Sequence, residues 1–127
     1  MNYLFDNCIS PKMADMLRAL GEDTHALRED FPQDIEDIPL FTQLHGQKLV
    51  LVSTDTSQRT REHEARALKQ AGITAIYFGP FFQKMKLWGQ AIWLVTKWEK
   101  IKGVAENVVM GSVFEIKQNG SALFYRW

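Results

Sequence analysis

A run of apolar residues in the middle of the chain constrains the fold more than any other feature. Leu49–Val52 is apolar at every position and ends abruptly in a polar segment that contains Asp55. Such a run predicts a strand that is buried on both faces, as in parallel sheets. The chain opens in the same way, because Asn2–Phe5 leads into Asp6. Since ligands bind at the carboxyl ends of strands in open α/β sheets, we expect Asp6 and Asp55 to border one crevice.

Length and composition indicate one globular domain. The 127 residues are 46% hydrophobic and 24% charged, and a chain of this length buries most of its apolar surface without disulfides or metals. No run approaches the ~20 apolar residues that span a bilayer. The first residues lack the basic and apolar regions of a signal peptide, and Cys8 has no second cysteine to pair with. We therefore expect a cytoplasmic protein with no membrane segment.

Acidic and basic residues are unevenly distributed, although the formal net charge is zero. Residues 1–80 contain twelve Asp and Glu against eight Lys and Arg, whereas residues 81–127 contain three against seven. Carboxylates gathered at a metal site, beside cations that meet a polyanion, would produce this asymmetry. Chance also produces it in so short a chain. The charge alone therefore leaves both explanations open.

Strands and helices are predicted to alternate along the chain. Strands are predicted over residues 2–6, 23–27, 49–52 and 73–78, and helices over 11–20, 34–46, 61–71 and 85–102. Ser10 and Pro11 mark the start of the first helix, while Pro39 allows the second helix to begin only near residue 38. Asn119-Gly120, between strands predicted over 113–116 and 123–125, indicates a terminal β-hairpin. This order predicts an α/β fold with a mostly parallel sheet covered by helices.

The helix predicted over 85–102 has an apolar face and a basic face. The residues expected to face the core are Trp88, Ala91, Ile92, Val95, Trp98 and Ile101. The residues expected on the opposite, exposed face are Lys86, Gln90, Trp93, Lys97 and Lys100. Lysines that pair with phosphates around a tryptophan that stacks on a base are typical of single-stranded RNA binding. A solvated helix face with one misplaced aromatic residue is the alternative explanation.

Three aspartates are placed to converge. Asp6 and Asp55 follow strands, and Asp37 lies near the start of the helix between them, where two other acidic residues compete with it. Like charges repel unless a cation neutralises them, and Mg²⁺ or Mn²⁺ prefers such oxygen ligands. Glu64, on the next predicted helix, is a candidate fourth carboxylate. A single Asp at a strand end is more often a cap or a turn former, so the prediction depends on the group as a whole.

Two arginines follow Asp55 and are expected at the mouth of the same crevice. Arg59 and Arg61 are suited to clamp a scissile phosphate through bidentate hydrogen bonds. Ion pairs with Glu62 and Glu64 are the alternative role for both arginines.

Several short motifs together resemble the PIN-like family. Their order and spacing over about residues 3–102 are closest to the small VapC-type PIN-like proteins of bacterial toxin–antitoxin loci. The residues that carry the resemblance are Leu4-Phe5-Asp6, Leu20-Gly21 with His25, Phe31-Pro32 with Asp37, Val52-Ser53-Thr54-Asp55, Arg59, Glu64, Gln70-Ala71-Gly72-Ile73 and Trp98-Glu99. The resemblance implies a PIN-like three-layer α/β/α sandwich over residues 1–127, with a core of about 1–102 and a C-terminal hairpin extension of about 103–127.

The resemblance also implies a metal-dependent endoribonuclease that is the toxin of a toxin–antitoxin pair. Asp6, Asp37 and Asp55 correspond to the family's acidic metal-binding positions, and the ion would be Mg²⁺ or Mn²⁺. Glu64 would orient the nucleophile, and Thr54 would hydrogen-bond a carboxylate ligand. The expected partners are RNA, a cognate antitoxin protein and a second copy of the chain.

One departure from the wider PIN pattern keeps a second hypothesis open. Ser57 stands beside the predicted ligands, two residues after Asp55, where a further Asp is common. This favours a PIN-like module that binds RNA or a protein without cleavage, whereas the three preserved aspartates favour the nuclease. The aromatic residues of Tyr77–Phe82 are either core or a patch for an antitoxin. A receiver-like phosphoacceptor domain would need a lysine after this strand, and Tyr77–Pro80 has none.

Overall fold

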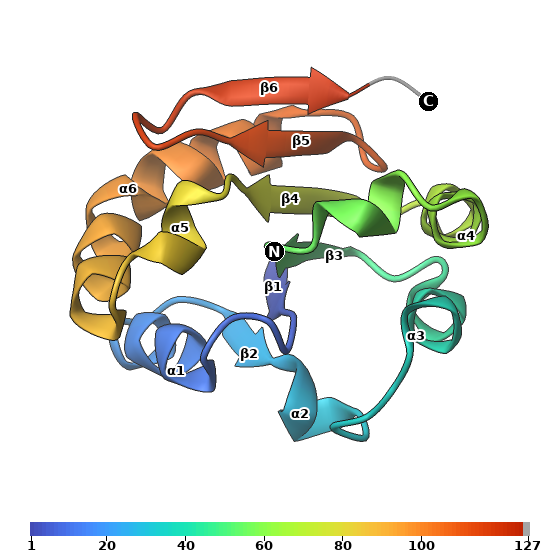
Figure 1. Cartoon of the computed structure of the whole chain (residues 1–127), viewed down its shortest axis with the longest axis horizontal. Coiled ribbons are helices and arrows are strands. Elements are labelled where there is room, and N and C mark those ends of the chain that lie inside the picture. The colour runs from blue at the N-terminus through green and yellow to red at the C-terminus, as the bar shows by residue number, and fades with distance from the viewer. Residues whose placement is uncertain (126–127) are drawn as a thin grey trace.

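Six strands form one sheet in the computed structural model, which describes residues 1–125 (Figure 1). The strands are β1 (Asn2–Phe5), β2 (Thr24–Ala26), β3 (Leu49–Ser53), β4 (Thr74–Phe78), β5 (Val113–Ile116) and β6 (Ala122–Tyr125). Their order is β2-β1-β3-β4-β5-β6, in which the first five are parallel and β6 runs antiparallel to β5. The predicted mostly parallel sheet with a C-terminal β-hairpin is confirmed. Because β5 pairs with β4, the hairpin continues the main sheet.

Helices alternate with these strands. They are α1 (Pro11–Ala19), α2 (Leu27–Asp30), α3 (Asp37–Leu44), the 3₁₀ helix η1 (Thr56–Arg59), α4 (Glu62–Ala71), α5 (Phe81–Lys84) and α6 (Leu87–Asn107). Ser10 caps α1 as predicted, because its side-chain oxygen accepts the backbone N–H of Lys12. The short helices α2, α5 and η1 lie almost entirely outside the predicted helices and strands, since one turn has no periodicity to recognise. α6 extends past residue 102 because its buried stripe continues to Ala105, and one interior glycine costs only about 1 kcal/mol.

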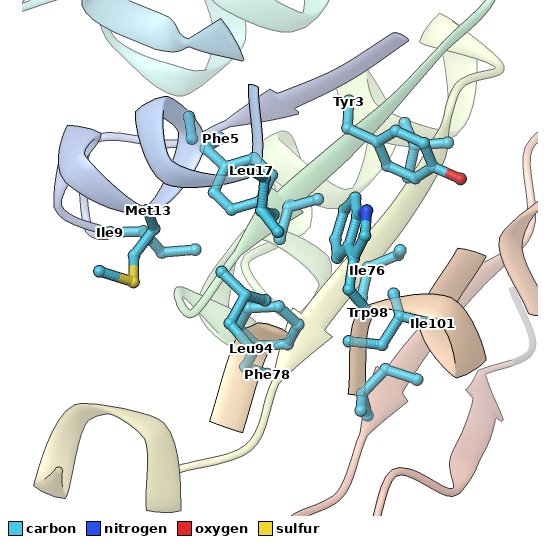
Figure 2. Close-up of a cluster of buried hydrophobic side chains, with 14 of the residues drawn as sticks. Tyr3, Phe5, Ile9, Met13, Leu17, Ile76, Phe78, Leu94, Trp98 and Ile101 are labelled. Atoms are coloured by element: carbon cyan, nitrogen blue, oxygen red, sulfur yellow. The ribbon is translucent and has the colours of Figure 1, made fainter. Parts of the chain in front are cut away.

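Helices cover both faces of the sheet, which confirms the three-layer sandwich. α1 and α6 pack on one face, and α3 and α4 pack on the other (Figure 1). Figure 2 shows the first core, which includes Phe5, Leu17, Leu94 and Trp98. The second core includes Leu40, Phe41, Leu51, Leu68 and Tyr77. Every residue of β3 is buried, as the run Leu49–Val52 predicts.

The two neighbouring strands β1 and β3 place the candidate carboxylates. From β1 the chain crosses to β2 on one side, and it then returns to β3 on the other side of β1. α1 and α4, which follow β1 and β3, lie on opposite faces of the sheet. In open α/β sheets, ligands bind outside the carboxyl ends of the strands at such a switch point. The register pairs Phe5 with Val52, so the next residues, Asp6 and Ser53, lie side by side at this edge.

The faces predicted for α6 are wrong in part. Trp93 is only 8% exposed, packs against aromatic side chains of β4 and α5, and donates its Nε1–H to the main-chain oxygen of Gln118 at 2.8 Å. Trp88 is instead 81% exposed, and Ile92 and Val95, one and two helical turns later, are also exposed. The helix has apolar side chains on more than one side, so its periodicity fits two alternative buried faces. Packing against the aromatic residues of β4 and α5 decides which face is buried. Within residues 1–125, no helix combines the length and the apolarity needed to cross a membrane.

The aromatic residues around the end of β4 belong to the core. Tyr77, Phe78 and Phe82 are at most 1% exposed. The ring of Phe81, which is half-buried, lies 4.9 Å from that of Trp93 between centroids. Of the two alternatives for Tyr77–Phe82, the structure therefore supports the core.

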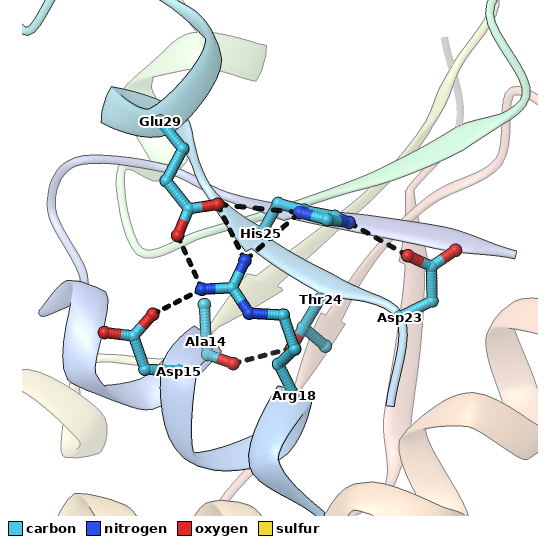
Figure 3. A network of polar contacts seen from close by, with 7 residues as sticks. All are labelled: Ala14, Asp15, Arg18, Asp23, Thr24, His25 and Glu29. Carbon is cyan, nitrogen blue, oxygen red and sulfur yellow. Dashed lines mark hydrogen bonds and ion pairs between the residues drawn. The ribbon is translucent and has the colours of Figure 1, made fainter. Parts of the chain in front are cut away.

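A network of charged side chains joins α1, β2 and α2 at the edge of the sheet (Figure 3). Arg18 donates to both oxygens of Glu29, at 2.9 Å from Nη1 and 2.7 Å from Nη2, and to Asp15 at 2.7 Å. His25 lies beside Asp23, with 3.0 Å between Nε2 and Oδ1. Such exposed pairs contribute little to stability one by one, but together they orient α2.

Candidate functional site

Asp6 follows β1 and is buried beside the end of β3, with 7% of the residue exposed. Its Oδ1 accepts the backbone N–H of Asn7 at 2.8 Å, and its Oδ2 accepts the hydroxyl of Ser53 at 2.9 Å. The Oγ of Ser53 in turn accepts the backbone N–H of Asp55 at 3.0 Å. The Ser53 side chain therefore links the Asp6 carboxylate to the main chain of Asp55.

Asp55 caps the 3₁₀ helix η1. Its Oδ1 accepts the backbone N–H of Ser57 at 3.2 Å and also bonds the Ser57 hydroxyl. Ser57 therefore serves as a hydrogen-bond partner of Asp55, at the position where a further carboxylate is common in the family it resembles. One oxygen of Asp55 is engaged locally in this way.

Gln58, which no sequence pattern singles out, lies at the centre of the site and is 1% exposed. Its Nε2 donates to Asp6 Oδ2 at 2.9 Å and to Asp37 Oδ1 at 3.0 Å. Its Oε1 accepts the hydroxyl of Tyr77 at 3.0 Å. One amide group therefore joins Asp6, which follows β1, to Asp37, which begins α3.

A sequence signal for this arrangement is present in β4 but not in η1. Tyr77 brings a hydroxyl into an otherwise apolar buried strand, and a buried tyrosine hydroxyl usually needs a hydrogen-bond partner. Gln58 offers no such signal, because a glutamine in a short polar segment is normally exposed.

Burial and neighbouring carboxylates change the ionisation of Asp37. Burial raises the pKa of Asp37 from 3.8 to about 6, and the negative charges of Asp6, Glu64 and Asp55 add to this shift, while the amide hydrogen bond opposes it. Burial and the negative charges of Asp6, Asp37 and Asp55 also raise the pKa of Tyr77. Asp37 therefore holds its proton to a higher pH than an ordinary aspartate.

Two arginines border the carboxylates, and the chain itself engages both. Arg61 donates to Glu64 at 2.9 Å, although the Arg61 side chain is 60% exposed. The Arg59 guanidinium lies over the ring of Tyr125, 3.4 Å from its centroid, and Tyr125 donates its hydroxyl to Glu115 at 2.7 Å. Within residues 1–125, the buried Nε of Arg59 has no hydrogen-bond partner. Tyr125 of the hairpin therefore holds the side chain of Arg59, the last residue of η1.

The remaining predicted site residues are Thr54, Lys86, Trp93 and Lys97, and each is either engaged by another part of the chain or exposed. The Thr54 hydroxyl accepts a hydrogen bond from Gln83 at 2.8 Å, so Ser53 rather than Thr54 supplies the hydroxyl that holds a carboxylate. Lys97 packs against Gly120 in the β5–β6 turn, and Lys86 is exposed just before α6. Trp93, predicted to stack on RNA, is buried.

A family model described as a PIN like domain matches residues 1–79, which is more than half of the chain. The chain belongs to the PIN-like domain family. PIN-like domains commonly have nuclease activity. The matched region of this PIN-like chain contains Asp6, Asp37, Asp55 and Glu64. No curated protein and no solved structure matched the chain.

The donor set of the PIN-like site suits a hard divalent cation. Asp6 and Asp37 direct one oxygen each to the same point, where the Gln58 amide nitrogen now lies. Carboxylate oxygens are the ligands that Mg²⁺ prefers in proteins. Within residues 1–125, however, no three His, Cys, Asp or Glu side chains are grouped closely enough to hold a metal ion. Because the Gln58 amide nitrogen lies between the two oxygens, binding of a cation by Asp6 and Asp37 requires a rearrangement of Gln58.

The raised pKa of Asp37 leads to an expected pH dependence of stability. Because this pKa is about 6 in the folded protein and 3.8 ordinarily, the folded protein keeps a proton that the unfolded chain has already released. The stability of the metal-free protein should therefore decrease as the pH rises from about 4 to about 7. Asp37→Asn keeps an oxygen that accepts the Gln58 hydrogen bond and removes the charge. We expect this variant to melt at a higher temperature than the wild type near pH 8 but not near pH 4, by thermal unfolding in EDTA.

The matched control is Asp34→Asn, which alters an exposed aspartate three residues earlier. This control should show the pH dependence of the wild type. An Asp37→Asn protein whose melting temperature falls with pH as steeply as that of the wild type would contradict the role assigned to Asp37.

Proposed function

We propose that this PIN-like chain is a metal-dependent endoribonuclease that hydrolyses RNA phosphodiester bonds. The observation that carries the proposal is that two carboxylate oxygens converge on one atom, Gln58 Nε2. Asp6 Oδ2 lies 2.9 Å from this nitrogen and Asp37 Oδ1 lies 3.0 Å from it. The backbone N–H of Asp55 is linked to the Asp6 carboxylate through the hydroxyl of Ser53. Carboxylates gathered at the carboxyl edge of a parallel sheet, one of them with a raised pKa, support a cation-dependent catalytic site.

In this proposal Asp6, Asp37 and Asp55 would hold Mg²⁺ or Mn²⁺ after the Gln58 amide has moved aside. The bound ion would lower the pKa of a water molecule and offset charge on the phosphodiester. Ser53 orients the Asp6 carboxylate through its hydroxyl. Glu64 would orient the attacking water and accept its proton. The water oxygen would bond to phosphorus while the bond to the 3′ oxygen breaks, and the 3′ oxygen would take a proton from solvent. The products would carry a 5′-phosphate and a 3′-hydroxyl.

RNA is the proposed substrate because cations border the carboxylates. Arg61 can exchange Glu64 for a phosphate, since the Arg61 side chain is 60% exposed. The side chain of Arg59, the last residue of η1, is held against the ring of Tyr125. The β5–β6 turn follows a strand parallel to β4, so Lys97, which packs on this turn, lies toward the same edge of the sheet. Lys97 and the exposed Lys86 would extend the phosphate contacts.

We further propose that the chain is a VapC-type toxin, with a cognate antitoxin and a second copy of the chain as its partners. The support is the resemblance of the motifs that run from Leu4 to Glu99, together with the family match over residues 1–79.

A non-catalytic PIN-like module that binds RNA or a protein is the second candidate. The Gln58 amide bridges Asp6 and Asp37, and Ser57 engages Asp55. These hydrogen bonds satisfy the carboxylates without a cation, which favours a site that no longer needs one.

Two measurements together separate the two candidates. One is cleavage of a labelled single-stranded RNA in the presence of Mn²⁺ or of EDTA, and the other is a calorimetric titration of the protein with Mn²⁺. A nuclease should bind Mn²⁺ and cleave the RNA, and EDTA should abolish this cleavage. Folded protein that binds no Mn²⁺ at millimolar concentrations and leaves the RNA intact would overturn the nuclease proposal. Retention of RNA by that inactive protein would support the second candidate.

A further inference from the structure

The amide of Gln58 occupies the point on which Asp6 and Asp37 converge. Its Nε2 lies 2.9 Å from Asp6 Oδ2 and 3.0 Å from Asp37 Oδ1, so both amide hydrogens are used. We propose that this arrangement, the Gln58 bridge, is a built-in competitor for the metal ion: it satisfies the two carboxylates in metal-free protein and must leave before a cation binds. The inference rests on the proposed function, because it concerns the metal of that site.

Tyr77 fixes the orientation of the Gln58 bridge. The Tyr77 hydroxyl donates to Oε1 at 3.0 Å, so the amide oxygen faces the hydroxyl and the amide nitrogen faces the carboxylates. The reverse orientation would set Oε1 against two negatively charged oxygens and remove the acceptor of Tyr77. Gln58 is 1% exposed and Tyr77 is 0% exposed, so water has little access to either group. The bridge is therefore held by the core and not by chance contact at a surface.

The Gln58 bridge and a cation need the same oxygen lone pairs. An ion that binds Asp6 Oδ2 and Asp37 Oδ1 together must take the place of the nitrogen that lies between them. Hydrogen bonds to carboxylates are stronger than those between neutral groups, so displacing the amide raises the concentration of metal that the site requires. Because the amide has no net charge, a divalent cation still prevails once it is concentrated enough.

The bridge also explains how the two carboxylates remain close together in the folded protein without a metal ion. Two neighbouring carboxylates that lacked the amide would repel each other in a site of restricted solvent access. The amide gives each of them a donor, so the metal-free fold keeps the site assembled. The expected consequence is weaker metal binding in exchange for a stable metal-free state.

Mn²⁺ titration by calorimetry on the wild type and two variants tests the bridge. Gln58→Met nearly preserves the side-chain length but removes both the amide donor and the amide oxygen. We expect this variant to bind Mn²⁺ about tenfold more tightly than the wild type, because two charge-assisted hydrogen bonds no longer compete. Tyr77→Phe should strengthen binding by a smaller factor, because the amide stays but loses its anchor.

The matched control is Gln90→Met, since the amide of Gln90 donates to the main-chain oxygen of Phe82 at 2.9 Å and involves no carboxylate. This control should bind Mn²⁺ as the wild type does. Melting temperatures with EDTA and with Mn²⁺ give a second readout. The increase on adding Mn²⁺ should be larger for Gln58→Met than for the wild type or for Gln90→Met.

The outcomes distinguish this inference from the proposed function. Equal or weaker binding by Gln58→Met, beside a wild type that binds Mn²⁺, would overturn the competitor and leave the metal-dependent function standing. Mn²⁺ binding by Gln58→Met but not by the wild type would support the competitor and show that the Gln58 bridge blocks the wild-type site. No binding by any of the proteins would overturn both. If Gln58→Met does not fold, Tyr77→Phe decides, and an affinity equal to that of the wild type would overturn the bridge.

Discussion

Asparagine in place of Asp6 is expected to lower the rate of RNA cleavage by about 10²–10⁴-fold. Asp6 directs a charged oxygen to the point that it shares with Asp37, and a neutral amide cannot replace that charge. A bound ion contributes several kcal/mol of charge stabilisation to a reaction of this kind, and each 1.36 kcal/mol corresponds to about a factor of ten in rate. Single-turnover cleavage of labelled RNA measures the effect, and Mn²⁺ calorimetry on the same variant should show weakened binding.

The folding of Asp6→Asn has to be verified beside its activity. The carboxylate accepts hydrogen bonds from Asn7, Ser53 and Gln58, and the amide group of an asparagine would face one of the N–H donors in either orientation. We therefore expect a lower melting temperature but a native circular dichroism spectrum. Asp34→Asn, the same change at an exposed position, should cleave RNA at the wild-type rate. Folded Asp6→Asn protein with wild-type activity would show that Asp6 is not part of a catalytic site.

Alanine in place of Trp93 is expected to destabilise the protein by about 3–5 kcal/mol, the largest effect on stability among the changes considered. Trp93 is 8% exposed, packs against Phe78, Phe81 and Phe82, and donates a hydrogen bond to Gln118. Its removal leaves a cavity among these rings and an acceptor without its donor. Since domains are stable by only about 5–15 kcal/mol, urea denaturation should show a large decrease in the unfolding midpoint.

Trp88→Ala is the matched control on the same helix, because Trp88 is 81% exposed. Its effect on the free energy of unfolding should stay within about 0.5 kcal/mol. A Trp93→Ala protein with wild-type stability and reduced affinity for RNA would reverse this assignment and restore the stacking role that the basic face of the helix predicts.

Features that depend on neighbouring residues are predicted correctly from the sequence. The apolar run Leu49–Val52 becomes a fully buried strand, since a segment without a polar face has to be covered on both sides. Ser10 and Pro11 begin α1, and Gly72 ends α4 in a left-handed conformation with φ of 69°, because capping involves only a few adjacent residues. The placement of Asp6 at the carboxyl end of a central strand follows from the same local patterns.

Features that depend on distant segments are not predicted. The apolar residues of α6 fit two faces, and the aromatic rings of β4 and α5 decide that Trp93 rather than Trp88 is buried. Gln58 belongs to a short polar segment whose composition indicates an exposed loop. It is buried because Tyr77, nineteen residues later, gives its oxygen a donor, while two aspartates from other segments accept its hydrogens.

The local sequence therefore specified the parallel sheet, the ends of several helices and the aspartates that reach the edge of the sheet. The packed fold specified which side chains lie between those aspartates. The physical reason is that caps and buried strands are determined by contacts within a few residues. A hydrogen-bond network that links β1, α3, η1 and β4 exists only after these elements have packed together.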